Sequence, residues 1–177
     1  MSENGATTPA LDARPMSPDE MAAWQRLAAV VELLPPALDA QLLRDAKLTH
    51  FEYTVLMVLA DAAAHTARMT AIASSTNATL PRLSHVVRRL EERGLVERFP
   101  CPEDRRATNA RITDAGLALL DAAAPGHHDT VRSVVLDALN AEQLDQLYLI
   151  AGSLLERLDP DGKLTATACH PAKAASA

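Results

Sequence analysis

Apolar residues recur at helical spacing along most of this chain and alternate strictly over only one short stretch. From Trp24 to Leu42, and again from Leu144 to Leu158, they return every three or four positions, which is typical of amphipathic helices. The stretch from Leu95 to Phe99 instead alternates and contains β-branched and aromatic residues, which is typical of a strand. The pattern therefore predicts a mainly α fold with one small β-hairpin.

Residues that commonly cap helices divide the helical pattern into segments. Such residues begin five of the expected helices: Ser17, Thr49, Thr79, Thr113 and Asn140. Thr49 is followed three residues later by Glu52, the spacing of a capping box. Two internal pairs, Pro35-Pro36 and Pro125-Gly126, are expected to kink or interrupt their helices, because proline lacks the backbone donor.

The middle of the chain has the pattern of a helix-turn-helix followed by a hairpin. A short helix over 70–74, a polar turn over 75–78 and a second helix that ends before Gly94 form the first motif. The strand over 95–99 then turns through 100–106 and returns over 107–112. A hairpin in this place is a wing.

These elements suggest a division of the chain into regions. Residues 48–112 form the winged helix-turn-helix, and residues 17–47 and 113–158 form a helical region. The last helix has an apolar surface wider than one small lobe needs, so the helical region is expected to mediate dimerisation. Residues 1–16 and 159–177 lack periodicity and are expected to be disordered tails.

Charge is distributed unevenly along the chain. The whole sequence carries −6, yet the segment from Arg68 to Arg111 contains nine Arg against five acidic residues, a net +4. A basic segment within an acidic chain marks a place where a polyanion can bind, although a solvated charged face would have the same composition.

The second helix of the motif has the side chains that a DNA-reading helix needs. Leu83, Val86, Val87 and Leu90 share one face, which leaves the polar residues on the others. The N-terminal end of a recognition helix enters the major groove, where Arg can contact guanine and Ser or His can contact bases or phosphates. The DNA-binding residues expected on this helix are Thr79, Pro81, Arg82, Ser84, His85, Arg88 and Arg89. Of these, Arg82, Ser84 and His85 are assigned to bases, and Arg88 and Arg89 to phosphates.

The tip of the hairpin is also basic. Arg105 and Arg106 are expected to enter the minor groove, whose negative potential attracts guanidinium groups. Asp104 would repel phosphate, so its expected role is structural, through pairing with a nearby Arg.

Three segments together resemble the MarR family of bacterial regulators. They are residues 48–56, residues 83–96 with the sequence LSHVVRRLEERGLV, and the wing motif Asp104-Arg105-Arg106 followed by Ile112-Thr113-Asp114-Ala115-Gly116. The resemblance covers about residues 20–158. It implies a homodimer in which the first and last helices intertwine, a pseudo-palindromic operator, repression, and release by a small aromatic or anionic effector. It also makes Arg106 the wing arginine.

The resemblance further implies an effector site between the helical region and the winged lobe. Residues there that could line it are Trp24, Leu27, His50, Tyr53 and Met57. Tyr53 is the strongest candidate, because an aromatic ring with a hydroxyl can stack on a ligand and bind a carboxylate. Each of these residues also fits the core or ordinary surface. His127 and His128 are expected on the surface, because adjacent helical positions diverge by about 100°.

Other classes of function have less support. The sequence contains no nucleophile elbow, phosphate-binding glycine loop or metal-ligand spacing, so neither an enzyme nor a cofactor or metal is expected. No stretch is long enough to span a membrane and the N-terminus lacks the core of a signal peptide, so a cytoplasmic protein is expected. Two alternatives stay open: a winged-helix protein-interaction module that does not read DNA, and a redox-responsive regulator that uses Cys101.

Overall fold

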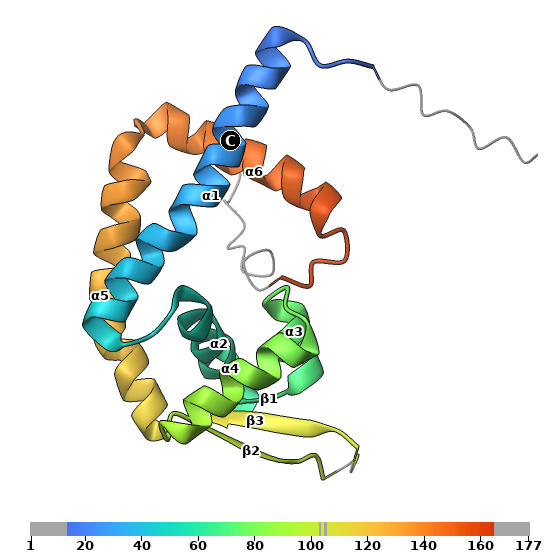
Figure 1. The fold of residues 1–177 in the computed structure, drawn as a ribbon, viewed down its shortest axis with the longest axis vertical. Coiled ribbons are helices and arrows are strands. Elements are labelled where there is room, and N and C mark those ends of the chain that lie inside the picture. The colour runs from blue at the N-terminus through green and yellow to red at the C-terminus, as the bar shows by residue number, and fades with distance from the viewer. Residues whose placement is uncertain (1–13, 103, 105, 165–177) are drawn as a thin grey trace, which may run out of the picture. The chain divides into compact units, whose positions relative to one another are not determined.

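The computed structural model describes residues 14–102, 104 and 106–164, most of which lie in helices, with one small sheet (Figure 1). In chain order the helices are α1 (Pro18–Ala46), α2 (His50–Asp61), α3 (Met69–Ser75), α4 (Leu80–Glu92), α5 (Asp114–Val134) and α6 (Ala141–Leu158). The strands are β1 (Thr66–Arg68), β2 (Val96–Pro100) and β3 (Thr108–Ile112). Most of both predicted tails falls outside the described residues. The predicted mainly α fold with a winged helix-turn-helix is confirmed.

The chain divides into two compact units at Pro35 and Pro36. The first unit contains the N-terminal part of α1, where Trp24, Leu27 and Val30 expose their side chains. The second unit contains the rest of α1 and all other elements.

Helix α1 continues through Pro35 and Pro36, so these prolines do not split it, and the alternative that they kink it stays a prediction. Each proline removes one backbone donor, which leaves the carbonyl four residues earlier without its helical partner. Those carbonyls belong to Val31 and Glu32, which are exposed, so water can satisfy them.

Helices α2, α3 and α4 pack around a shared apolar core beside the sheet (Figure 1). The predicted caps form: Thr49 and Glu52 make a reciprocal capping box on α2, and the Thr79 hydroxyl accepts from the Arg82 N–H. The face of α4 that was expected to be apolar is buried, with Leu83 and Leu90 fully inaccessible. Consequently the polar faces of α4 are presented to solvent.

The sheet has three antiparallel strands in the order β1-β3-β2. The predicted hairpin forms, with Val96 opposite Ile112 and Pro100 opposite Thr108. Strand β1 was not predicted. It has only three residues, and it follows Ala64 and His65, which adopt a left-handed backbone conformation that nothing in their side chains requires.

The end of α1 is tied to the end of α4. Lys47 takes a left-handed conformation just after α1, and Arg93, which follows the last residue of α4, reaches it. Arg93 Nη1 donates to the Lys47 carbonyl at 2.8 Å, and Nη2 donates to the Ala46 carbonyl at 3.3 Å. Two carbonyls at the end of a helix thereby gain a positively charged partner.

Helix α5 also continues through its proline, which corrects the expected interruption at Pro125 and Gly126. The carbonyl deprived of its donor belongs to Asp121, which is exposed. Gly126 packs closely on α1, because a Cβ at this position would lie 2.9 Å from Gln41 Nε2. Tertiary contact therefore holds the helix where local propensity disfavours it.

Helix α6 begins with a second capping box, made by Asn140 and Gln143, and buries none of its residues. Large apolar side chains are nevertheless exposed along it: Leu144, Leu147, Tyr148, Leu149, Ile150, Leu154 and Leu158. Among the described residues, no helix combines the length and the apolar character that crossing a membrane requires.

Candidate nucleic-acid interface

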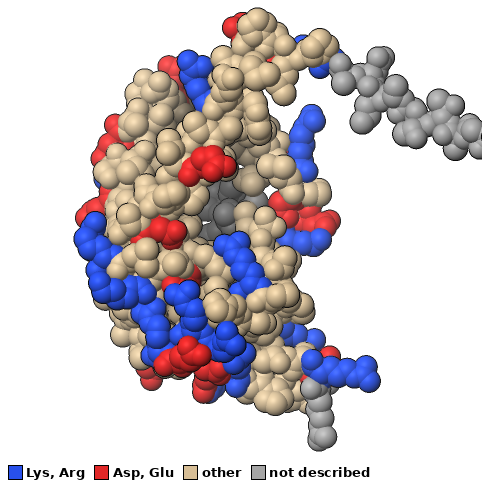
Figure 2. All heavy atoms as spheres, in the orientation of Figure 1, with Lys and Arg blue, Asp and Glu red and all other residues tan. Residues whose placement is uncertain are grey.

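The solvent-facing side of α4 carries most of the residues that the sequence assigned to the recognition helix. Pro81, Arg82, Ser84, His85 and Arg88 are exposed, while the buried face anchors the helix in the core. The space-filling view shows Lys and Arg side chains gathered over the end of the molecule that contains α4 and the hairpin, with acidic side chains among them (Figure 2).

Arg82 is held against an aromatic ring. Its Cζ lies 4.2 Å from the centroid of the Phe51 ring, in the first turn of α2. A guanidinium over an aromatic face is attracted by the ring, and its N–H donors point along its own plane. Phe51 therefore limits the orientations of Arg82 while leaving its donors available.

His85 and Arg88 form a second arrangement on the exposed side. Arg88 Nη2 lies 3.0 Å from His85 Nδ1, and Arg88 Nε lies 4.0 Å from the carboxylate of Glu92. Because guanidinium can only donate, Nδ1 accepts in this contact, and a neutral His85 then carries its proton on Nε2. The outer nitrogen of His85 is thus a donor suited to base or phosphate acceptors.

Arg89 is exposed, as its predicted phosphate contact requires, and it also lies beside a buried carboxylate. Its Nη2 lies 3.1 Å from Oε1 of Glu52, and the Glu52 side chain is only 1% exposed. The contact is an ion pair without the alignment of a hydrogen bond. Glu52 also accepts from the backbone N–H and hydroxyl of Thr49 at 2.8 and 3.0 Å. Arg89 compensates a buried charge that sequence reasoning treated only as a cap.

The wing tip is ordered by Asp104. Its Oδ1 accepts from the Arg106 backbone N–H at 3.0 Å, and its carbonyl accepts from the Ala107 N–H at 2.8 Å. Asp104 therefore binds the backbone of the turn, which agrees with a structural role, and its pairing with an arginine side chain stays a prediction. The Arg106 side chain is exposed, and Arg105 lies outside the described residues.

Cys101 lies at the base of the same turn. Its N–H donates to the Ala107 carbonyl at 2.9 Å, and its side chain is 2% exposed. Burial keeps the sulfur away from oxidants in solvent, so the geometry gives the redox alternative no support.

The residues suggested for an effector site lie in different environments. Trp24 and Leu27 are exposed on the first unit, and Tyr53 is in the core with 3% of its surface exposed. His50 and Met57 are half-buried on α2. Burial raises the pKa of the Tyr53 hydroxyl, which keeps it neutral.

Sequence reasoning placed His127 on the surface, but in the structure this residue is half-buried. The ring of His127, on α5, lies 4.6 Å from the Tyr53 ring and 5.7 Å from the His50 ring. Its Nδ1 is buried without a hydrogen-bond partner. Asp39 accepts the His50 backbone N–H at 2.5 Å. His128, the next residue, is exposed.

This histidine pair predicts a loss of stability in acid. Desolvation lowers the pKa of His50, opposed by Asp39; desolvation also lowers the pKa of His127, assisted by His50 and His128. Each group thus binds its proton more readily in the unfolded chain, whose ordinary pKa is 6.5. The free energy of unfolding should be constant above that value and fall as the pH drops through the folded pKa values. The slope is at most about 1.4 kcal/mol per pH unit for each proton taken up.

Urea denaturation between pH 8 and pH 5 measures this effect. His127→Phe keeps an aromatic ring against Tyr53 and should flatten the dependence, whereas the control His128→Gln should retain most of it. The same decline in all three proteins would show that other groups cause the acid sensitivity.

Comparison with known proteins identifies the family. Residues 48–108 match the model of the MarR family. The HTH-type transcriptional repressor YetL of Bacillus subtilis is 31% identical over 111 residues, which cover 63% of this chain and 66% of YetL. The chain thus spans just under two thirds of that curated relative.

Solved structures match over more of their length. Sco3205, a MarR family transcriptional regulator from Streptomyces coelicolor solved in complex with DNA, is 40% identical with a TM-score of 0.80, over 84% of this chain and 93% of that one. AbsC, another MarR family regulator from Streptomyces coelicolor, is 32% identical with a TM-score of 0.77, over 84% and 99%. With these similarities, and with a winged helix-turn-helix that presents its polar recognition face, the chain belongs to the MarR family of transcriptional regulators.

Proposed function

We propose that this protein is a transcriptional repressor of the cytoplasm that binds a pseudo-palindromic operator in double-stranded DNA. The observation that carries the proposal is the exposed side of α4, where Arg82, Ser84, His85 and Arg88 stand in one lobe with Arg106 of the wing. Sco3205, which shares 40% of its residues with this chain, was solved in complex with DNA. A helix that presents donors beside a basic hairpin suits a major groove and the adjacent minor groove.

The proposed binding unit is a homodimer. Helix α6 leaves its apolar side chains exposed, and so does the N-terminal part of α1, where Leu27, Val30 and Val31 are accessible. Exposed apolar faces of this extent are typical of surfaces that are covered in an assembly. A second copy supplies identical faces, and two-fold symmetry matches a pseudo-palindromic site.

The proposed signal is a small aromatic or anionic effector. His50, Tyr53 and Met57 lie on one helix of the winged lobe, with His127 of α5 against the Tyr53 ring. Trp24 and Leu27 belong to the same proposal through the family resemblance. Aromatic rings and neutral imidazoles can stack on a ligand ring and bind a carboxylate.

The decisive experiment is selection of duplexes from a random pool, followed by affinity measurements between 50 and 200 mM salt. We expect a pseudo-palindromic duplex with half-sites about one helical turn, or a small multiple of it, apart. Affinity should fall by about 10³-fold or more over this range, as for a protein that contacts several phosphates. Sedimentation should find two chains per duplex. Failure to select any duplex at any salt would leave the protein-interaction module, and a monomer at micromolar concentration would contradict the dimer.

A further inference from the structure

A shallow pocket separates the recognition helix from the wing. It encloses about 210 Å³, and its lining includes Arg68, Thr70, Ser84, Arg98, Arg106 and Thr108. These residues come from β1, α3, α4, β2, the hairpin turn and the start of β3. All six residues are exposed, so the pocket is open to a large ligand.

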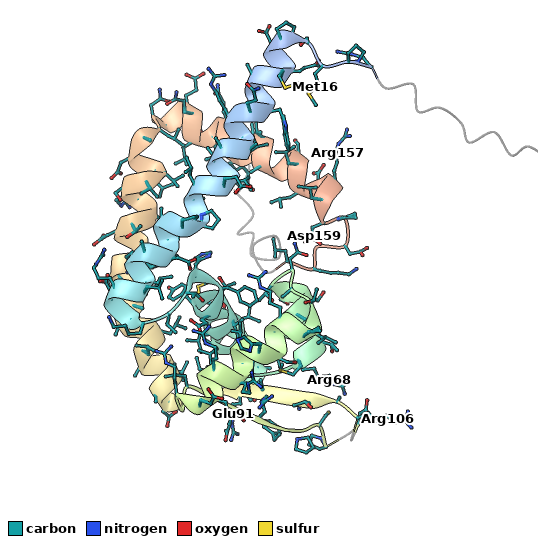
Figure 3. The ribbon with its side chains drawn as sticks, in the orientation of Figure 1. Met16, Arg68, Glu91, Arg106, Arg157 and Asp159 are labelled. Atoms are coloured by element: carbon teal, nitrogen blue, oxygen red, sulfur yellow. The ribbon has the colours of Figure 1, made fainter. Side chains whose placement is uncertain are left out.

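The pocket is basic by construction. Arg98 is held at its edge, because Nε donates to Glu91 Oε2 at 2.9 Å and Nη2 donates to the same oxygen at 2.5 Å. Arg68 and Arg106 lie on the same side of the winged lobe, away from Glu91 (Figure 3). No acidic side chain is among the described residues of the lining. The lining thus contains three arginines, of which Arg98 is paired with Glu91, and the hydroxyls of Thr70, Ser84 and Thr108.

The position of the pocket relative to the two DNA-reading elements defines what can occupy it. If α4 lies in the major groove and the wing lies in the neighbouring minor groove, the sugar-phosphate strand that separates these grooves must cross the space between them. That space is the pocket, since Ser84 of α4 forms one side and Arg106 and Thr108 of the hairpin form the other. Arginine and hydroxyl side chains are the groups that proteins use to bind phosphate oxygens.

We propose that this pocket binds one backbone phosphate of the operator, and that Arg68 is its main cationic ligand. The inference rests on the proposed DNA-binding function and adds a site to it. Arg68 differs from the residues expected from the sequence because it precedes the helix-turn-helix, at the end of a strand that the sequence did not predict. Its contact positions the duplex against α4 and does not select bases.

The test removes the charge from each side of the contact. Duplexes selected by the wild-type protein are prepared with a single neutral methylphosphonate at each backbone position in turn, and binding is measured for wild type and for Arg68→Gln. We expect one position per half-site, between the bases read by α4 and the minor groove under the wing, to lower wild-type affinity by about tenfold. Arg68→Gln should lower affinity similarly on every sequence and reduce the salt slope by about one unit per half-site.

The critical result is the affinity when the Arg68→Gln substitution and the neutral phosphate are combined. On the duplex neutralised at that position, Arg68→Gln should cost nothing further, since the interaction is already absent. Additive losses at every position would overturn the proposal, as would a salt slope unchanged by the substitution. A third outcome would assign the pocket to a free anion instead. In that case inorganic phosphate at millimolar concentration would compete with the duplex, and no methylphosphonate position would change the affinity.

Arg111→Gln is the matched control. Arg111 lies on β3 opposite Thr66, close to Arg68 in the same sheet, but it lines a different hollow and pairs with Glu97. Its loss removes the same charge from the lobe and should leave the methylphosphonate profile intact. If the wild type binds no duplex, the proposed function fails; if it binds and Arg68→Gln behaves as Arg111→Gln does, only the phosphate pocket fails.

Discussion

Gly116→Ala should lower the free energy of unfolding by about 3 kcal/mol, although alanine is the better helix former. A Cβ on Gly116 would lie 2.3 Å from the Leu95 carbonyl oxygen and 2.6 Å from Ile112 Cγ1. The first of these atoms belongs to the backbone and already accepts the Thr113 N–H at 3.0 Å. Room for the methyl group can therefore be made only by moving the start of α5 away from Leu95, which lies between α4 and β2.

The same displacement would break a capping arrangement. The Thr113 hydroxyl accepts from the Gly116 N–H at 3.1 Å and donates to the Gly94 carbonyl at 2.7 Å. One residue thus joins the first turn of α5 to the turn that follows α4. The cost of Gly116→Ala combines overpacking with the loss of this junction.

Urea denaturation at constant protein concentration measures the change, because a dimer's stability depends on concentration. Ala118→Gly is the control: Ala118 is exposed on the same helix, so this substitution reports helix propensity alone, about 1 kcal/mol. A gain of stability in Gly116→Ala, equal to the loss in Ala118→Gly, would contradict the predicted clash.

Arg82→Ala and Arg106→Ala should both weaken DNA binding, but in different ways. The stack on Phe51 holds the Arg82 guanidinium at the N-terminal end of α4, where base edges come within reach. Loss of one bidentate base contact costs about 1–3 kcal/mol on the preferred sequence and little on sequences that lack the base. Arg106 on the wing is proposed to contact the minor groove or its phosphates, so its loss should weaken all duplexes alike.

Binding to the selected duplex and to its single base-pair variants separates the two effects. Arg82→Ala should erase preference at a particular base pair of each half-site, whereas Arg106→Ala should preserve the order of preference. Both residues are exposed, so the free energy of unfolding should stay close to that of the wild type and serves as the folding control. Uniform losses over every sequence for both variants would refute readout by Arg82.

Local rules predicted much of this fold from the sequence. The capping boxes at Thr49 and Asn140 depend on residues three positions apart, and the buried stripe of α4 depends on helical spacing, so both can be recognised without tertiary information. The hairpin could be predicted in the same way, because its two strands are neighbours in the sequence. The wing and the recognition helix could therefore be placed within a few residues of their observed ends.

The features that sequence reasoning missed depend on distant partners. Pro125 lies within α5, where the next residue, Gly126, approaches Gln41 of α1, and β1 forms because Ala67 pairs with Ala110 across more than forty residues. Arg89 and His127 likewise depend on α2: Arg89 pairs with Glu52, and the His127 ring lies against the Tyr53 ring. Spacing along one helix carries no information about such neighbours.

The pair of hydrogen bonds from Arg93 has a mechanical consequence. The guanidinium follows the recognition helix directly in the chain and holds the final carbonyls of α1. A tilt of the C-terminal part of α1 must either drag the trailing end of α4 with it or leave a cation and two carbonyls to find new partners. Arg93 therefore couples the C-terminal end of α1 mechanically to α4, the helix that we propose reads DNA.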